Sequence, residues 1–384
     1  MRFVKKFLKW FLIILVLANL GIIISGKTYL YKGIANTYLK GHSGPDIDEY
    51  KIFDTREVKA GTYLPIPNGK DFNAQTIDTK AFEPYGTVAY LVIKNDSVRY
   101  EQYWEGYGEN SVSNSFSMAK SFIGLLVGCA LQDGIIKSID QPVGDFLEAY
   151  KQGDNSKLTI RQLLSMSSGI NFDENYVNPF AYPAAAYYGC DIKKLTEGYK
   201  VTEEPGRIFK YLSGNTELLA LIIEKASGKH VSEYMSEKLW QPLGAKNTAL
   251  WMLDHADGME KAYCCFNSNA RDFSRFGLLC LHNGNWNGKQ LIPETYMQQS
   301  VKPAPLLDEM GKPNKCYGYQ WWMLEYKGHH IAYCRGILGQ YIITIPDVKM
   351  VIVRLGHKRD KEKQNDHPRD LFVYIDRALE TFAN

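Results

Sequence analysis

The sequence has no strong charge of either sign. It contains 45 Lys and Arg against 42 Asp and Glu, which gives a formal net charge of +3. Residues 1–40 hold seven basic side chains and no acidic one, so the rest of the chain carries 38 basic against 42 acidic side chains. A body this close to neutral lacks the basic stripe that nucleic-acid binding requires. We therefore expect no nucleic-acid partner.

Signatures of metal and cofactor sites are also missing. The seven cysteines include no C-x-x-C pair, and the eight histidines include no H-E-x-x-H. Residues 284–289 (G-N-W-N-G-K) are one residue too short for a P-loop, and no G-x-S-x-G nucleophile elbow occurs. An odd number of cysteines, in a chain long enough to build a core, argues against a disulfide scaffold. We predict no metal and no organic cofactor.

A long apolar run lies near the N-terminus. Residues 7–26 are apolar apart from Lys9, Asn19 and Ser25, and twenty helical residues reach about 30 Å, the thickness of a bilayer core. The basic side chains at its start are Arg2, Lys5, Lys6 and Lys9. Because basic residues favour the cytoplasmic side, we predict that residues 1–30 form a single N-terminal membrane anchor. The body then lies outside the cytoplasm, on the periplasmic side of a bacterial cytoplasmic membrane.

Two other interpretations of the apolar run remain open. A cleaved signal peptide would need small residues at its cleavage site, whereas Ile22, Ile23 and Ile24 stand there. The second alternative is a helix buried in the core of the body. The position of the run and its flanking charges favour the anchor.

The rest of the chain changes from β-rich to helical and back to β-rich segments. Residues 31–80 are predicted to be a linker and a wrapping segment. Two β-rich runs on either side of a short Asn-Asp-Ser turn predict a hairpin, and three more β-rich runs lie near the C-terminus. The predicted strands are 87–94, 98–104, 331–335, 341–345 and 350–355. The predicted helices are 117–131, 158–165, 215–226, 231–240 and 369–382.

This order of segments indicates the fold class. We predict an α+β domain over residues 81–384, in which the N- and C-terminal parts of the body build one antiparallel sheet that helices flank. A helical subdomain, about residues 136–260, is inserted between those parts.

Ser117 and Lys120 form an S-x-x-K motif at the start of the helix predicted at 117–131. Residues three apart on a helix lie on one face, and a serine that opens a helix stands at the positive end of its dipole. Apolar surroundings disfavour an ammonium group, so a neutral Lys120 can accept the serine proton. The alternative is an ordinary N-cap serine followed by a lysine that reaches solvent.

Tyr211 and Ser213 belong to a second candidate segment, F-K-Y-L-S-G-N at residues 209–215, just before a predicted helix. A tyrosine in such a turn can relay a proton between a lysine, a serine and a leaving group. In a chain with 26 tyrosines, a packing role is the alternative.

A third candidate segment, C-R-G-I-L-G-Q at residues 334–340, lies between two predicted strands. Glycines such as Gly336 let the backbone approach a ligand closely. An edge-strand N–H could supply half of an oxyanion hole, with the Ser117 N–H as the other half. The alternative is a β-bulge without a catalytic role.

In this order the three segments resemble the motifs of the serine β-lactamase and penicillin-binding-protein superfamily, on its class C and esterase side. The resemblance runs from about residue 80 to the C-terminus. Ser117-x-x-Lys120 matches the first motif, and Tyr211-x-Ser213 is similar to the second, which is Tyr-x-Asn in class C β-lactamases. Residues 334–336 occupy the third position, which is Lys-Thr-Gly or His-x-Gly in the family.

Two departures narrow this resemblance. Ser213 replaces the asparagine that helps to hold a β-lactam amide, and Cys334 replaces the cation of the third motif. This version is similar to the 6-aminohexanoate-dimer hydrolase branch and related carboxylesterases. Arg335 could bind a carboxylate instead, although strand alternation would turn it away from the cleft.

The resemblance implies a β-lactamase/transpeptidase-like fold and acyl transfer through a serine ester. Ser117 would attack a small-molecule or short peptide-like ester or amide, with Lys120 as base and Tyr211 as proton relay. The backbone N–H groups of Ser117 and Ile337 would hold the oxyanion, with Ser213 and Gly336 in supporting positions. No cofactor is implied.

Three other functions remain as alternatives. The first is a D,D-carboxypeptidase or β-lactamase acting near the cell wall. The second is a non-catalytic penicillin-binding-like module, and the third is a generic secreted binding domain. Residues 171–189, rich in Tyr and Ala, are a candidate lid over the cleft.

Overall fold

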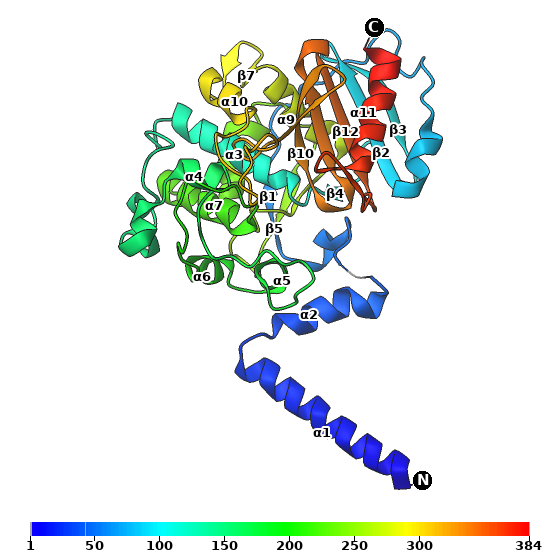
Figure 1. Cartoon of the computed structure of the whole chain (residues 1–384). Coiled ribbons are helices and arrows are strands. Elements are labelled where there is room, and N and C mark those ends of the chain that lie inside the picture. Colours follow the sequence, from blue (N-terminus) through cyan, green and yellow to red (C-terminus); the bar gives the residue numbers. More distant parts are fainter. Residues whose placement is uncertain (1, 43, 384) are drawn as a thin grey trace.

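The computed structural model describes residues 2–42 and 44–383. A long N-terminal helix, α1 (Arg2–Ile24), projects away from a body that contains the rest of the described chain (Figure 1). The body has a six-stranded sheet on one side and a mainly helical region on the other (Figure 1).

The six-stranded sheet is antiparallel and joins distant parts of the chain. Its order is β3-β2-β12-β11-β10-β9, and Lys94 at the end of β2 lies opposite Met350 at the start of β12. The hairpin from the start of the body therefore lies beside the C-terminal strands, as predicted. The strands are β2 (Thr87–Lys94), β3 (Ser97–Tyr103), β9 (Trp322–Tyr326), β10 (His329–Arg335), β11 (Tyr341–Ile345) and β12 (Met350–Gly356). Strand β9 was not predicted.

Helices cover both faces of this sheet, which explains why its central strands β2, β11 and β12 are buried along almost their whole length. Side chains alternate between faces along a strand, so Ile342 of β11 packs in the core beneath α3 and α9, whereas Ile343 packs in the core beneath α11. The three helices are α3 (Met118–Gln132), α9 (Ala270–Leu281) and α11 (Arg369–Phe382). Helix α3 is buried on all sides from Met118 to Ala130 because it lies between the sheet and the helical region.

The helical region comes from the middle of the chain and packs on α3 mainly through α7 (Ser213–Ser227). Its other helices are α4 (Ile160–Leu164), α5 (Tyr182–Tyr188), α6 (Ile192–Glu197) and α8 (Val231–Met235), which continues as a π-helical turn at Ser236–Trp240. The predicted helices at 158–165, 215–226 and 231–240 are thus confirmed with shifted bounds. The α+β, β-lactamase-like architecture is confirmed as well.

A second, four-stranded sheet was not predicted. Its order is β1-β5-β6-β4, and β4 leads directly into the turn that carries Ser117. The strands are β1 (Thr55–Val58), β4 (Ser113–Asn114), β5 (Ala249–Met252) and β6 (Phe266–Ser268). Residues 31–80, predicted to be a linker and a wrapping segment, contribute the paired strand β1. The smaller remaining elements are α10 (Glu294–Ser300), β7 (Asn285–Trp286), β8 (Lys289–Gln290), β13 (Lys363–Gln364) and β14 (His367–Pro368).

Helix α1 has no buried residue, so the interpretation of this segment as a core helix is wrong. It is long and apolar enough to cross a membrane. The chain then turns through residues 25–28 and forms a second, shorter helix, α2 (Tyr29–Asn36), which packs against α5 of the body.

Candidate active site

Ser117 lies in a tight turn between β4 and α3. The preceding residue, Phe116, has a φ of +44°, a conformation that L residues seldom adopt. The Asn114 side chain holds this turn, because its Oδ1 accepts a hydrogen bond of 2.8 Å from the Phe116 N–H. The chain therefore presents Ser117 immediately before the first turn of α3.

Lys120 lies one helical turn after Ser117 and is only 1% exposed. Its Nζ is 3.0 Å from the Ser117 Oγ, and it donates a second hydrogen bond of 2.9 Å to the Tyr263 carbonyl. Among the described residues, no carboxylate lies within ion-pair distance of this amine. The predicted pair is therefore in contact, and a backbone carbonyl rather than a counter-ion orients the amine.

The segment around Tyr263 was not predicted to belong to the site. The Tyr263 ring lies over the Lys120 amine at 5.2 Å, and its backbone N–H donates to Oε2 of Glu217 at 3.2 Å. Glu217 comes from α7 and is fully buried, and this burial raises the pKa of its carboxyl group well above the usual value. A protonated Glu217 carboxyl can remain buried at neutral pH without a cation beside it.

A disulfide joins the adjacent residues Cys264 and Cys265, directly after Tyr263. The other five cysteines are free. Because the bonded residues are neighbours in the chain, this bond closes no long loop. It is consistent with the expectation that the chain is not a disulfide scaffold.

Tyr211 and Ser213 lie at the start of α7, but they have different surroundings. The Tyr211 ring centroid is 5.2 Å from the Lys120 Nζ, and the ring packs on Trp322. Ser213 is fully buried, and Glu174 accepts hydrogen bonds from both its backbone N–H and its hydroxyl group. Ser213 thus ties the candidate lid to α7.

The third segment follows the end of β10. A Cβ at Gly336 would collide with the carbonyl oxygen of Ser115, so glycine is required where this segment approaches the turn before Ser117. Cys334 is buried beneath α3, and the Arg335 guanidinium stacks on Trp322 at 3.3 Å. Within the part of the chain that the structure describes, the N–H groups of Ser117 and Ile337 donate to no protein acceptor.

Ser117 and Ile337 line the same cavity, which contains about 950 Å³ of empty space including its open mouth. None of the described residues that line it has a charged side chain. Part of the segment 171–189, the candidate lid, forms one wall. The lid residues on this wall are Tyr176, Val177, Pro179, Pro183, Ala184, Tyr187 and Tyr188.

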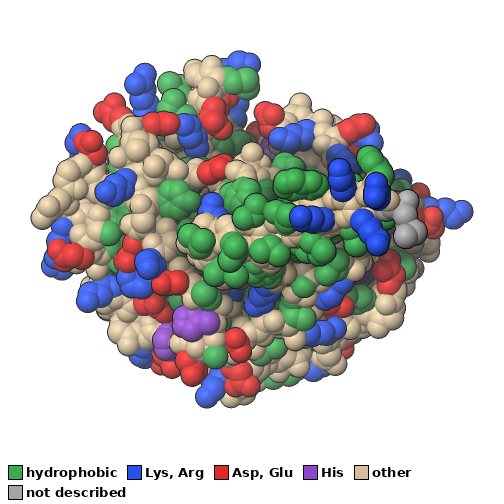
Figure 2. Space-filling model, turned by 90° about the horizontal axis from the view of Figure 1, so that it is seen from below, with side chains coloured by type: hydrophobic (Ala, Val, Ile, Leu, Met, Phe, Trp, Pro, Cys, Tyr) green, Lys and Arg blue, Asp and Glu red, His purple; other side chains and the backbone are tan. Residues whose placement is uncertain are grey.

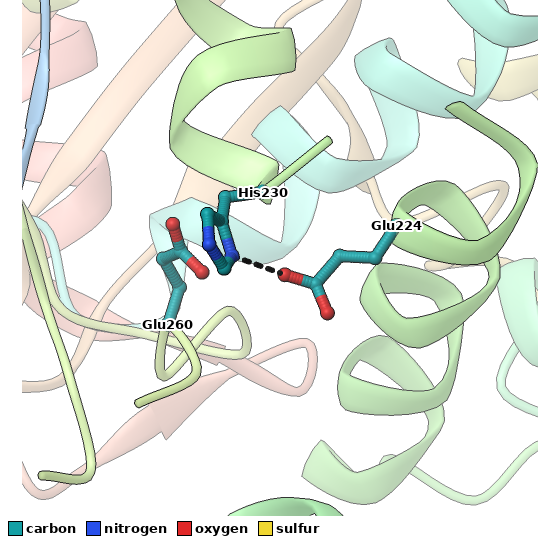
Figure 3. A group of neighbouring side chains, drawn as sticks. All are labelled: Glu224, His230 and Glu260. Carbon is teal, nitrogen blue, oxygen red and sulfur yellow. Dashed lines mark hydrogen bonds and ion pairs between the residues drawn. The ribbon is translucent and has the colours of Figure 1, made fainter. Parts of the chain in front are cut away.

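A separate polar cluster consists of Glu224, His230 and Glu260, whose ligand-type atoms all lie within 4.8 Å of one another (Figure 3). The His230 Nδ1 is 3.3 Å from Oε1 of Glu224. The Arg56 guanidinium lies 2.7 Å from Oε1 of the buried Glu260 and already supplies a positive charge there. None of these residues lines the cavity that contains Ser117. We interpret the cluster as an ion-pair network.

Sequence reasoning missed Tyr263, Glu217 and Glu174. None of them belongs to a short motif, and they reach the site from a loop, from the second turn of α7 and from the lid. One signal was present. Glu217 directly precedes the apolar run 218–223 of a helix, and such a position indicates a buried carboxyl group that needs a partner.

Comparisons with known proteins identify the family and the fold. The β-lactamase family model matches residues 79–374. The 6-aminohexanoate-dimer hydrolase of Paenarthrobacter ureafaciens is 26% identical over 319 residues, which cover 77% of this chain and 79% of that protein.

Two solved structures have similar folds. A Bacillus anthracis protein provisionally assigned as a 6-aminohexanoate-dimer hydrolase superposes with a TM-score of 0.74 at 24% identity, covering 87% of this chain and 92% of the other. The octameric penicillin-binding protein homologue of Pyrococcus abyssi gives a TM-score of 0.61 at 18% identity, covering 79% and 75%. Because the family model spans most of the body, the chain belongs to the β-lactamase family.

Proposed function

We propose that this protein is a serine hydrolase that cleaves an ester or amide bond through a covalent acyl-serine intermediate. The observation that carries the proposal is the 3.0 Å contact between the Lys120 Nζ and the Ser117 Oγ, at a buried position without a neighbouring carboxylate. An ion pair would hold Lys120 as an ammonium ion, and its absence among the described residues leaves the amine free to act as a base.

The chemistry follows from this contact. Neutral Lys120 accepts the hydroxyl proton as the Ser117 Oγ attacks the substrate carbonyl, while the Tyr263 carbonyl keeps one amine N–H in place. The proton then passes to the leaving alcohol or amine, with Tyr211 as the relay beside the amine. Water attacks the acyl-serine ester in the second half of the reaction and regenerates the Ser117 hydroxyl group.

The backbone N–H groups of Ser117 and Ile337 form the oxyanion hole in this proposal. Both residues line the cavity, and the strained turn at Phe116 together with Gly336 brings their segments close to each other. Such donors stabilise the charge that develops on the carbonyl oxygen in the transition state, and each contributes about 3–4 kcal/mol to lowering the barrier.

The cavity favours an ester or amide without a charge near the scissile bond. Arg335, the remaining cation of the third segment, stacks on Trp322 and does not line the cavity. This arrangement supports an esterase or amidase over a D,D-carboxypeptidase or β-lactamase, whose substrates carry a carboxylate. Because the Ser117–Lys120 contact is intact, it also supports an enzyme over a non-catalytic penicillin-binding-like module.

We propose further that α1 anchors the enzyme in the cytoplasmic membrane. Helix α1 is apolar and has no buried residue, and its basic residues lie in its first half, which favours a cytoplasmic N-terminus. The body then lies on the periplasmic side.

Covalent labelling tests the proposed function. A fluorophosphonate probe should form an adduct on the tryptic peptide that contains Ser117, and Ser117→Ala should abolish the adduct. Turnover of short p-nitrophenyl esters, the 6-aminohexanoate dimer, nitrocefin and a D-Ala-D-Ala peptide should then rank the substrates, with the neutral esters first. A folded protein that forms no adduct and turns over none of the four would contradict the proposal.

A further inference from the structure

The cavity beside Ser117 is closed by a part of the chain that continues directly from the proposed membrane anchor. Helix α2 and the residues just after it provide one wall. The wall residues are Tyr29, Leu30, Gly33, Ile34, Thr37 and Tyr38. The candidate lid, which α2 contacts, provides another part of the wall. The residues that would contact the acyl part of a substrate are therefore mostly aromatic or aliphatic.

Helix α2 is held against the body by specific contacts. A Cβ at Gly33 would lie 3.3 Å from the Tyr188 ring, so the backbone of α2 approaches α5 closely there. The Lys32 Nζ lies 3.8 Å from the centre of the Phe53 ring, and the Tyr29 hydroxyl donates to the Pro179 carbonyl at 3.1 Å. The wall is thus part of the folded body.

The same helix is tied to α1. Only residues 25–28 separate the two helices, which limits their separation to about 17 Å when the link is extended. In the structure they are closer, because the Tyr31 hydroxyl of α2 donates to Oδ1 of Asn19 in α1 at 2.8 Å. If α1 spans the bilayer, α2 and the cavity wall lie at the bilayer surface.

An apolar patch, which we call the α2–lid patch, is exposed where α2 meets the lid. Its exposed side chains are Tyr31, Ile34, Tyr38, Leu39, Tyr176, Val177 and Phe180. Lys27 and Lys40 lie at the two ends of the same short stretch of chain. Figure 2, seen from the α1 side, shows α1 in front of this face as a band of hydrophobic side chains with Lys and Arg side chains at one end, with further hydrophobic side chains beside it. Apolar and aromatic groups flanked by lysines are typical of surfaces that lie in a membrane interface.

The patch and the cavity share residues. Ile34, Tyr38, Tyr176 and Val177 are all exposed or partly exposed at the surface, and all four line the cavity that contains Ser117. An apolar path therefore continues from the proposed bilayer surface to the Ser117 side of the cavity.

We propose that the substrate is a membrane-resident amphiphile, an ester or amide of a long acyl chain that enters from the bilayer through the α2–lid patch. This inference rests on the proposed hydrolase function. In the first step a bond forms between the Ser117 Oγ and the acyl carbon, the bond from that carbon to the alcohol or amine breaks, and the serine proton leaves with the alcohol or amine. Water then releases the fatty acid and restores the serine, so the products are one acid and one alcohol or amine.

Chain length provides the first test. The full-length protein is assayed in detergent with p-nitrophenyl esters from acetate to dodecanoate, each below its critical micelle concentration. We expect kcat/KM to rise at least tenfold from the acetate to the decanoate, and Ile34→Trp, which fills the cavity, should shift the optimum to shorter chains. A flat or falling profile for the wild type would overturn the inference.

The second test asks whether substrate enters from the bilayer. The full-length protein is reconstituted in phosphatidylcholine–phosphatidylglycerol vesicles that contain a long-chain ester, and the rate is divided by the rate with soluble p-nitrophenyl acetate. Leu39→Glu and Phe180→Glu introduce charge into the α2–lid patch outside the cavity lining and should lower this ratio at least tenfold. Met310→Glu, an equally exposed apolar position outside the patch, is the matched control.

Fluorophosphonate labelling separates the two levels of failure. Suppose that Ser117 is labelled, but kcat/KM does not rise with chain length and the patch variants do not lower the ratio of the two rates. The amphiphile inference is then wrong, and the hydrolase proposal stands. If Ser117 is not labelled in the folded protein, the hydrolase proposal itself is wrong, and the amphiphile inference is wrong as well.

Discussion

The backbone of Tyr263 links Glu217 to Lys120. Its N–H donates to Oε2 of Glu217 at 3.2 Å, and its carbonyl accepts from the Lys120 Nζ at 2.9 Å. The orientation of the amine beside Ser117 thus depends on a buried carboxyl group that no short motif identifies. Glu217 is a positioning residue, because it acts on the site through another residue.

Replacing Glu217 tests this link. Burial raises the pKa of its carboxyl group well above the usual value, so Glu217→Gln keeps the size and neutrality of the side chain and should retain ester turnover. Glu217→Ala should lower kcat at least tenfold with little change in KM, because the Tyr263 carbonyl loses its support. A matching loss in both variants, or an effect on KM alone, would contradict the positioning role.

Removing the Lys120 amine should have a larger effect. We expect Lys120→Met to lower kcat/KM for p-nitrophenyl acetate about 1000-fold, in the range that positioned acid–base catalysts contribute. Lys210→Met is the control, because Lys210 forms a surface ion pair with Glu203 at 2.6 Å and lies beside Tyr211 in the sequence. Equal activity in Lys120→Met and wild type would remove Lys120 from the mechanism.

The proton relay assigned to Tyr211 can be tested by removing its hydroxyl group. Tyr211→Phe keeps the packing on Trp322 and should lower kcat about 100-fold, mostly for substrates with poor leaving groups. Tyr317, a buried neighbour whose ring centre lies 5.8 Å from that of Tyr211, supplies the control Tyr317→Phe. The comparison uses steady-state rates on alkyl and p-nitrophenyl esters, and similar rates for Tyr211→Phe and the wild type would show that another group protonates the leaving atom.

The Ile337 N–H can be deleted without disturbing the preceding backbone. Gly336 has φ −106° and ψ 159°, which the residue before a proline adopts readily, so Ile337→Pro removes the donor at a compatible position. We expect kcat to fall by about 100- to 1000-fold, which corresponds to about 3–4 kcal/mol. Ile337→Ala retains the N–H and should keep most of the activity; a larger loss in this variant would assign the role to the side chain.

His367 makes the fold sensitive to acid. It is 3% exposed and shares a hydrogen bond of 2.7 Å with the Tyr333 hydroxyl; burial, with a further contribution from Arg335, lowers its pKa to about 4. Between its ordinary value near 6.5 and about 4, the unfolded state binds the proton and the folded state does not. Stability present above pH 6.5 is therefore lost as the pH falls towards 4, by about 3 kcal/mol in total.

Urea unfolding of the full chain in detergent measures this effect. Wild type should lose stability between pH 7 and pH 4.5, and His367→Gln should show a shallower decline over the same range. An identical pH dependence for the two proteins would mean that His367 does not control acid stability.

Local patterns in the sequence predicted much of the fold. The hairpin at 87–94 and 98–104, the strand at 341–345 and the helix at 369–382 all appear, with bounds that agree or differ by a residue. Runs of β-branched residues and a 3.6-residue period express preferences of the segment itself, so they can be interpreted without knowledge of distant residues. Strands β1, β5 and β6 are short, and their pairing depends on partners far apart in the chain, which explains why they were missed.

The sequence by itself determined that Ser117 and Lys120 share a helix face, because residues three apart on a helix lie on the same side of it. It also determined that the N-terminal segment is long and apolar. Only the tertiary structure decided that the Tyr263 carbonyl and Glu217 orient the amine, and that α2 closes the cavity beside Ser117. These relationships join residues separated by 46 to 143 positions, and packing of the whole core, rather than any local preference, brings such residues together.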